Sequence, residues 1–226
     1  HTGIAQIRLL ARDVVGVSTS PFNFTQQVYR HQGQRWEADI TLPPMERADA
    51  EQWASFLLRL RGSYGTFLLG DPLNATPRGS AATAPGTPLV NGASQTGDEL
   101  IIDGIPTSGS DYLKAGDYIQ LGSAATSTLH KVLEDVAIDG SGDATLNLWP
   151  KIRTAPADNA AVTVSNAKGV FRLASNETMW DIRNASIYGI TFGAVEASHA
   201  TSRRPTAASS ASVSPAKCFL RATSTS

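Results

Sequence analysis

The sequence predicts a mainly β protein, in which a β-sandwich is flanked by one α-helix and carries a small inserted β-barrel. Residues 35–42 alternate apolar and polar side chains with the period of a half-buried strand. Residues 47–61 show the only clear helical pattern, with apolar side chains on one face. Residues 86–168 contain short apolar segments separated by glycine-rich turns, which is typical of a small barrel or sandwich.

The helix is expected to cover a sheet. Pro43 and Pro44 end the strand before it, and Gly62 stands where a left-handed C-terminal cap belongs. A further strand is expected over residues 66–69. The side chains expected to anchor this core are apolar and lie on the inward faces of these elements: Trp36, Trp53, Phe56, Leu57, Leu60 and Trp180.

A hairpin is predicted near the N-terminus. Residues 4–17 form a first strand or pair of strands, and residues 22–29 pair with residues 35–42 through a turn at residues 31–34, where Gly33 can adopt a positive φ. The matching apolar faces place Phe22, Phe24 and Val28 on the core side. Strand alternation then places a polar, mildly acidic set on the opposite side, and these are the candidate channel-lining residues: Thr25, Gln27, Glu37, Asp39 and Thr41.

The domain organisation follows from changes in composition. Residues 74–88 are rich in Ala, Thr, Gly and Pro and indicate an exposed crossing. The inserted barrel then spans residues 86–168, and residues 1–78 plus 169–197 form the sandwich. Residues 198–226 are a tail rich in Ser, Ala and Thr, without acidic residues. Barrel strands are expected at residues 99–103, 117–121, 129–138, 144–148 and 161–164.

Composition argues against several classes of protein. The chain has 226 residues, 41% of them hydrophobic and 17% charged, and a net charge of −1, which does not indicate a nucleic-acid or anionic membrane surface. Its single cysteine, Cys218, excludes an intrachain disulfide and a cysteine-built metal site. No segment has the length of a transmembrane helix and no secretion signal opens the sequence, so we expect synthesis in the cytoplasm and no membrane insertion.

The search for reactive groups predicts no catalytic, cofactor or metal site, and hence no enzyme. The four histidines are scattered without metal-ligand spacing. The aspartates at positions 135, 139 and 143 lack the spacing and the closing glutamate of a calcium loop, so a polar turn is the better interpretation. The glycine at the end of residues 62–65 is not followed by the Lys and Ser/Thr of a phosphate-binding loop.

Two aromatic residues of the barrel suggest an alternative function. Trp149 at a strand end, or Tyr112, could stack on a sugar ring, which would make the barrel a carbohydrate-binding module for a host surface. The favoured interpretation of Trp149, however, is that it plugs the mouth of the barrel. A tail-tip hydrolase is a third hypothesis, but no paired carboxylates or catalytic triad support it.

Two long segments resemble minor tail proteins of long-tailed bacteriophages, of the distal tail type. The first is WEADITLPPMERADAEQWASFLLRLRGSYGTFLLGDP, and the second is LKAGDYIQLGSAATSTLHKVLEDVAIDGSGDATLNLWPKIR followed by GVFRL. The resemblance covers roughly residues 20–195 and also extends to the order of the parts, which is a sandwich with a helix, an inserted barrel and a returning strand.

The resemblance implies a structural virion protein at the tail tip. Distal tail proteins form a ring, usually a hexamer, with the tail tube protein above and the tip or hub proteins below. DNA and the tape-measure protein pass through the ring without specific binding, and the barrel projects outward. An acidic inner face would suit this role, because it would not hold DNA phosphates.

Overall fold

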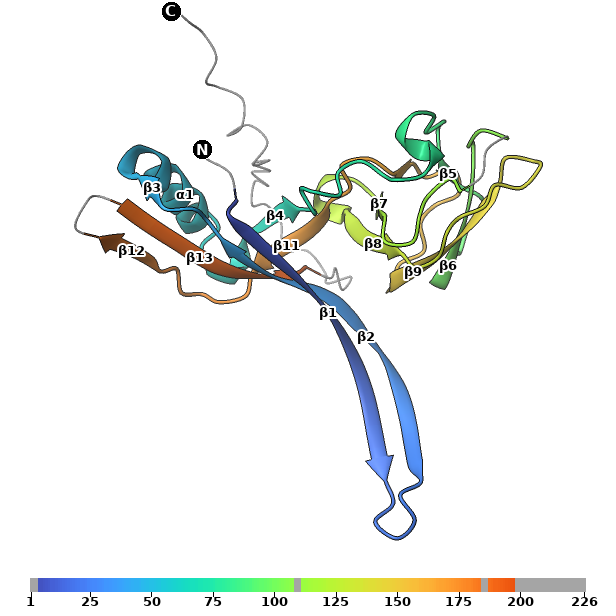
Figure 1. The fold of residues 1–226 in the computed structure, drawn as a ribbon, viewed down its shortest axis with the longest axis horizontal. Helices are drawn as coiled ribbons and strands as arrows, with labels where there is room; N and C mark the ends of the chain where they lie inside the picture. Colours follow the sequence, from blue (N-terminus) through green and yellow to red (C-terminus); the bar gives the residue numbers. More distant parts are fainter. Residues whose placement is uncertain (1–3, 108–110, 184–186, 198–226) are drawn as a thin grey trace, which may run out of the picture.

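The structure is a computed structural model, and it describes residues 4–107, 111–183 and 187–197 (Figure 1). The described chain is mainly β, with one α-helix, a six-stranded sheet that nearly closes into a barrel, and a separate sheet. This confirms the predicted fold class.

The larger sheet combines strands from both ends of the chain. Its order is β1-β2-β13-β11-β4, and both β12 and β3 also pair with β13, always antiparallel. Residues 169–196 thus return to the sheet that the first 69 residues begin. The strands are β1 Gln6–Thr19, β2 Gln26–Thr41, β3 Met45–Glu46, β4 Thr66–Leu69, β11 Gly169–Leu173, β12 Trp180–Arg183 and β13 Ile187–Glu196.

Helix α1 (Arg47–Arg59) lies beside this sheet (Figure 1). It ends two residues earlier than predicted, because the left-handed conformation begins at Arg61 (φ 52°), one residue before Gly62. Leu57 and Leu60 are buried, as expected. Trp53 and Phe56 are only partly buried and pack against the core with their rings 6.0 Å apart. A 3-10 turn, η1 (Gly62–Tyr64), leads into β4.

The smaller sheet forms the barrel, with the order β10-β7-β8-β9-β6-β5. A bridge between Leu89 and Ala161 brings its two edge strands together and nearly closes it. Its core is aliphatic, with Leu100, Ile119 and Leu146 fully buried. The elements are η2 Ser80–Ala82, β5 Leu89–Val90, β6 Gly97–Asp103, β7 Tyr118–Leu121, η3 Ala124–Thr126, β8 Thr128–Val132, β9 Ala144–Ile152 and β10 Val162–Thr163.

The barrel packs directly on the larger sheet. Trp36 is 4% exposed and its indole Nε1 donates a hydrogen bond to the carbonyl oxygen of Leu129, 2.9 Å away. Its ring meets Trp149 edge-on at 4.5 Å and Tyr118 at 6.0 Å. Tyr118 and Leu129, although they belong to barrel strands, therefore lie in the core of the larger sheet. The predicted anchor role of Trp36 is confirmed.

The predicted hairpin is wrong in its turn. Residues 31–34 lie inside β2, which is a single long strand, and β2 pairs with β1 rather than with residues 22–29. Gly33 is needed for a close approach between strands, since a Cβ there would lie 2.8 Å from Cγ2 of Val14. Phe22, Phe24 and Val28 are 95%, 80% and 60% exposed and do not belong to the core.

Trp180 is also not a core anchor, because it is 39% exposed. It lies on β12, which pairs only with β13 and therefore stands at an edge of the larger sheet. Strand alternation correctly placed Trp36 on a covered face, but it could not show that nothing among the described residues fully covers β12.

Candidate interaction surface: the protruding hairpin arm

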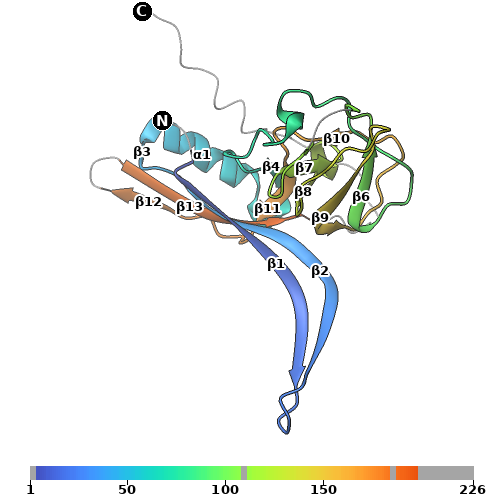
Figure 2. The same cartoon turned by 45° about the vertical axis from the view of Figure 1, so that its right-hand side comes forward.

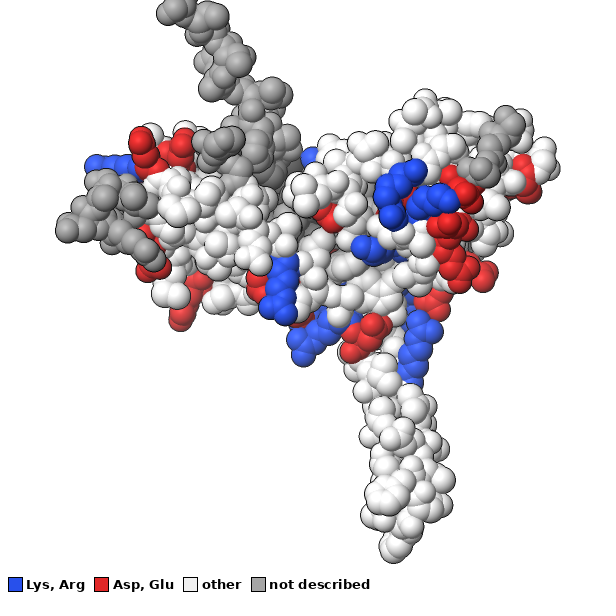
Figure 3. All heavy atoms as spheres, viewed as in Figure 1, with Lys and Arg blue, Asp and Glu red and all other residues white. Residues whose placement is uncertain are grey.

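The most conspicuous surface feature is a two-stranded arm, defined here as residues 14–29. It projects from the body of the protein as the far half of the β1–β2 hairpin (Figures 1 and 2). These sixteen residues contain no Lys, Arg, Asp or Glu, and in Figure 3 the arm carries no coloured side chains. Charged residues begin only at its base, with Asp13 and Arg30.

Both faces of the arm expose apolar side chains. On one face Val17 lies opposite Val28, and on the other Gly16 lies opposite Tyr29. Val14, Val15, Val17, Val28 and Tyr29 are each between 48% and 60% exposed. A two-stranded ribbon alone is at best marginally stable in water, and contiguous exposed apolar surface marks interaction sites. The arm thus has the character of a surface that a partner covers.

Both edges of the arm are open. β1 is the first strand of the larger sheet, and β13 pairs with β2 only at residues 37–41. The outward N–H and C=O groups of the arm therefore have no strand partner among the described residues. Open, uncharged strand edges are templates for pairing with another chain, and natural proteins usually protect them.

The arm ends in a compact turn at residues 20–25. Ser20 N–H donates to the carbonyl oxygen of Thr25 at 2.9 Å, and Phe24 N–H donates to the carbonyl oxygen of Ser20 at 3.0 Å. Asn23 Oδ1 accepts hydrogen bonds from the N–H and hydroxyl of Thr25, at 3.2 and 2.8 Å. The turn satisfies these groups internally, while the rings of Phe22 and Phe24 point into solvent.

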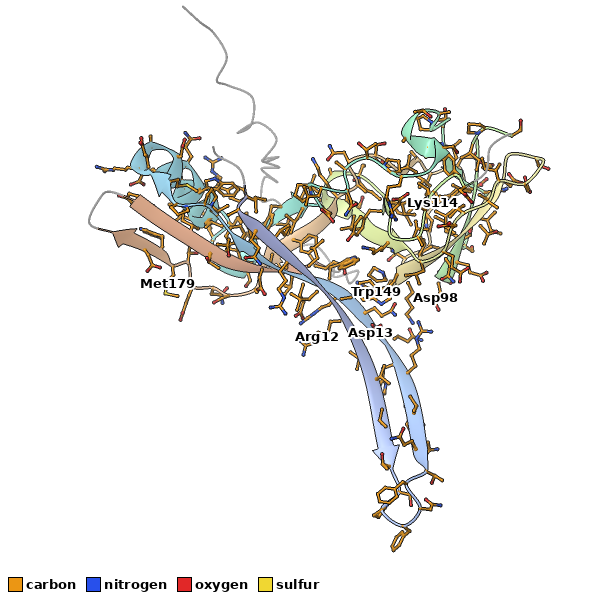
Figure 4. The ribbon with its side chains drawn as sticks, in the orientation of Figure 1. Arg12, Asp13, Asp98, Lys114, Trp149 and Met179 are labelled. Carbon is orange, nitrogen blue, oxygen red and sulfur yellow. The ribbon has the colours of Figure 1, made fainter. Side chains whose placement is uncertain are left out.

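Hydrogen bonds to the barrel fix the base of the arm, where Figure 4 labels Asp13 and Trp149. Asp13 Oδ1 accepts hydrogen bonds from Gln34 Nε2 at 2.7 Å and from Trp149 Nε1 at 3.1 Å. Gln34 is buried, and its Oε1 accepts a hydrogen bond from the backbone N–H of Lys151 at 2.9 Å. These contacts lie beside the irregularity between Asp13 and Val15 in the strand register. The barrel is therefore hydrogen-bonded to the arm base at the point where the regular pairing of β1 and β2 is interrupted.

A second group of polar contacts extends this junction. Glu196 Oε2, on a nearly buried carboxylate, accepts hydrogen bonds from the backbone N–H of Trp36 at 3.0 Å and from Arg153 at 3.2 Å. Arg153 also donates to the backbone carbonyl of Gln34. An exposed ion pair joins Arg30 to Asp98 of the barrel at 3.4 Å. Arm base, barrel and β13 therefore form one hydrogen-bonded unit.

The candidate channel-lining residues share one side only in part. Glu37, Asp39 and Thr41 lie on the face of β2 opposite Trp36, as predicted, and Gln27 continues that face into the arm. Thr25 instead belongs to the turn at the tip. All five are exposed or half-buried.

The predicted acidic character of this face is wrong. Arg12 and Arg35 donate hydrogen bonds to Glu37 at 3.2 and 2.6 Å, and Arg8 lies opposite Asp39. The hydrogen bond from Arg35, supported by Arg12, lowers the pKa of the Glu37 carboxyl, although partial desolvation opposes it. Three arginines therefore accompany two carboxylates, because β1 pairs here and supplies the charges that the expected hairpin omitted.

The rings of the two candidate sugar-stacking residues already contact other parts of the protein. Tyr112 is fully buried, its hydroxyl donates a hydrogen bond to the carbonyl oxygen of Pro85 at 2.6 Å, and burial raises its pKa to about 12. Trp149 packs against Trp36 and donates its indole N–H to Asp13. Neither ring is a free platform, which removes the observation behind the carbohydrate-binding hypothesis.

A cavity of about 310 Å³ opens where the barrel meets the end of β13, and its wall includes Lys151, Arg153 and Glu196. His130, also in this wall, is 4% exposed, with Nδ1 2.6 Å from the carbonyl oxygen of Pro150 and Nε2 2.9 Å from Oγ1 of Thr128. Burial, with a contribution from Arg153, lowers the pKa of His130 to about 4, although the hydrogen bond to Pro150 opposes this. His130 is thus a neutral, hydrogen-bonded part of the wall.

The described residues form neither a metal-binding cluster nor a membrane-spanning helix. Within residues 4–107, 111–183 and 187–197, no three His, Cys, Asp or Glu side chains are grouped so that they could hold a metal ion. The described chain also contains no helix with the length and hydropathy needed to span a membrane. Among the acidic residues of the loop at 135–143, Asp139 accepts backbone hydrogen bonds from Ser141 and Asp143, as expected for a polar turn.

Comparison with known proteins adds no relative: neither the protein-family models nor the curated proteins contain a match to this chain.

The arm and the hydrogen bonds at its base were not predicted, although the sequence contains signals of both. The turn residues Ser20, Pro21 and Asn23 favour a turn between two strands, and the uncharged run around them is unusual for an exposed segment. Gln34 occupies the same face of β2 as Trp36, which indicates a buried polar side chain that requires partners.

Proposed function

We propose that this chain is a structural virion protein that forms a ring at the distal end of a bacteriophage tail. In this role it joins the tail tube protein above to the tip or hub proteins below. The observation that carries the proposal is the arm, an uncharged two-stranded ribbon with two open edges and uncovered apolar faces. The resemblance of residues 20–195 to distal tail proteins supplies the biological setting.

The geometry of the arm favours a ring over other assemblies. Because β1 and β2 run in opposite directions, the β1 edge of one copy and the β2 edge of a parallel neighbouring arm are antiparallel. Each copy thus pairs its β1 edge with one neighbour and its β2 edge with the other neighbour. Such head-to-tail contacts close into a ring when the rotation between copies allows it. A hexamer is the expected order.

One face of the arms would then form a channel wall. The face that carries Gln27 and Tyr29 in the arm continues into Glu37 and Asp39 at its base. The arm portion is uncharged, and in the basal portion Arg12 and Arg35 are both paired with Glu37. Such a surface offers DNA few unpaired cations, so DNA and the tape-measure protein could pass without specific binding. This wall of mixed charge takes the place of the acidic wall expected from the sequence.

The experiment that tests this function examines both the purified protein and the virion. Negative-stain electron microscopy of the full chain should show rings with a central channel, and antibodies against the barrel should label the distal tip of intact tails. Labelling along the whole tail, or on the capsid only, would contradict the proposed position. A strictly monomeric protein at high concentration would contradict ring formation.

A further inference from the structure

The tip of the arm combines an unfavourable backbone conformation with two uncovered aromatic rings. Phe24 has φ 55°, in the left-handed region, where a bulky side chain is rare and strained. Its ring is 80% exposed and that of Phe22 is 95% exposed, so neither ring gains packing within the described residues that would offset the strain. Observed strain at an exposed position indicates a functional requirement.

The turn holds the two rings ready for contact. The N–H groups of Ser20 and Phe24 donate within the turn, and Phe22 N–H lies 3.4 Å from Oγ of Ser20. Residues 20–25 can therefore be covered by an apolar partner without leaving these donors unpaired. Phe22 follows the end of β1 and Phe24 precedes the start of β2, so along the chain Phe22 is nearer to the β1 strand and Phe24 is nearer to the β2 strand.

We propose that the tip is an aromatic clasp between copies of this chain, in which Phe22 of one copy packs against Phe24 of the next. The inference rests on the proposed ring. When the β1 edge of one arm lies beside the β2 edge of its neighbour, the Phe22 side of one tip meets the Phe24 side of the other. Residues 14–29 contain no charge that would repel a second copy.

The area that Phe22 and Phe24 would bury is large enough to contribute to an interface between copies. Buried phenylalanine side chains cover about 150–250 Å² each, so one Phe22–Phe24 pair supplies about 300–500 Å² of a standard interface of about 1,600 Å². Paired strand edges and the valines of the arm would supply further area. A second copy is the occupant that the observations favour, because the same edges that assemble the ring also bring the two rings together.

Disulfide cross-linking tests the clasp. In a Cys218→Ser background, Phe22→Cys and Phe24→Cys chains carrying different tags are co-expressed, and the assembled protein is treated with a mild oxidant. Because a disulfide requires Cα atoms within about 7 Å, we expect a cross-linked dimer that contains one chain of each tag. Rings made from either variant alone should give little dimer. Leu73→Cys, at a residue 92% exposed elsewhere on the surface, replaces Phe22→Cys in the matched control and should not cross-link to Phe24→Cys.

A second variant measures the contribution of the rings. Phe22→Ala/Phe24→Ala should raise the protein concentration at which rings half-dissociate by at least about tenfold, because both rings of the Phe22–Phe24 contact are lost at each interface. Both residues are exposed, so its melting curve as a subunit should match that of the parent.

The results of these experiments distinguish a failure of the clasp proposal from a failure of the ring proposal. Rings of normal mass without the mixed dimer, or with equal dimer in each variant alone, would overturn the clasp and leave the ring intact. Retention of assembled rings by phosphatidylcholine vesicles through Phe22 and Phe24 would also overturn it, because the tips would then be free to contact lipid. A protein that forms no rings would overturn both proposals.

Discussion

Trp36 belongs to the larger sheet and contacts the barrel through several groups. Its ring packs on Trp149 and Tyr118 of the barrel, its indole N–H is bonded to Leu129, and its backbone N–H is bonded to Glu196. Removing this side chain leaves a cavity and an unpaired carbonyl at the junction. A half-exposed tryptophan such as Trp180 has far less to lose.

We therefore expect Trp36→Ala to lower the free energy of unfolding by about 3–5 kcal/mol, as for other buried aromatic truncations. Trp180→Ala is the matched control and should lower it by about 1 kcal/mol or less. Urea titration followed by circular dichroism measures both. Similar losses for the two variants would show that the junction contributes little to stability.

His130 makes stability depend on pH. Its pKa is about 4 in the folded chain against 6.5 when unperturbed, so between these values the unfolded chain binds a proton that the folded chain does not. Stability from this group is therefore complete above about pH 6.5 and falls as pH decreases to 4. The loss is at most about 3 kcal/mol, since one pKa unit corresponds to about 1.4 kcal/mol.

The measurement is the free energy of unfolding between pH 4 and 7. His130→Gln should flatten its slope, whereas His31→Gln, at an exposed position, should leave the slope as in the parent. A slope that His130→Gln does not change would mean that other groups cause the pH dependence.

At the scale of elements, the hydrogen bonds at the base of the arm connect the β1–β2 hairpin to the barrel. Asp13 accepts hydrogen bonds from Gln34 and Trp149, so Asp13→Ala would leave two donors without their partner. Lost partners of this kind cost about 1–3 kcal/mol, whereas an exposed ion pair such as Arg30–Asp98 is worth about 0–1 kcal/mol.

Hydrogen exchange should separate these two contacts. Asp13→Ala should accelerate amide exchange in β1 and β2 near the arm base, while the barrel strands keep their protection. Asp98→Ala, the control, should change exchange in the same strands much less. Equal effects of the two variants would contradict the assigned role of Asp13.

Local sequence patterns predicted some elements well. They failed where contacts between strands far apart in the sequence determine the structure. Alternation at residues 35–42 and the helical period after residue 46 are local; residues 35–41 do lie in a strand, and the helix forms within two residues of its predicted bounds. Gly33 has the local signature of a turn, but its position is set by β1, whose Val14 passes close to it. The junction of Asp13, Gln34 and Glu196 spans more than 180 residues, and no local pattern connects them.

At the scale of the whole molecule, the barrel and the larger sheet share a packed boundary. Tyr118 and Leu129 of the barrel complete the core that contains Trp36, so deleting residues 86–168 would uncover that core. The domain boundaries expected from composition, with the barrel at residues 86–168, stay a prediction.

The charge of the proposed channel wall gives a further whole-molecule prediction. Glu37→Lys/Asp39→Lys would convert a face of three arginines and two carboxylates into a face with five cations. We expect assembled rings to bind DNA at low salt, and virions to eject DNA slowly, with both effects weakening as salt rises. Asp98→Lys/Glu99→Lys, on strand β6 of the barrel, is the control with the same change in total charge. DNA binding equal to the control would place Glu37 and Asp39 outside the channel.

Residues 14–29 are the segment that we propose assembles this chain into a closed ring. Native mass spectrometry of the full chain should be compared with a variant in which Asn-Gly replaces residues 16–29, so that a two-residue turn joins Val15 to Arg30. We expect one closed oligomer, a hexamer, for the full chain, and a folded monomer with unchanged core stability for the shortened chain. A shortened chain that still forms the same oligomer, or a full chain that remains monomeric, would contradict the claim.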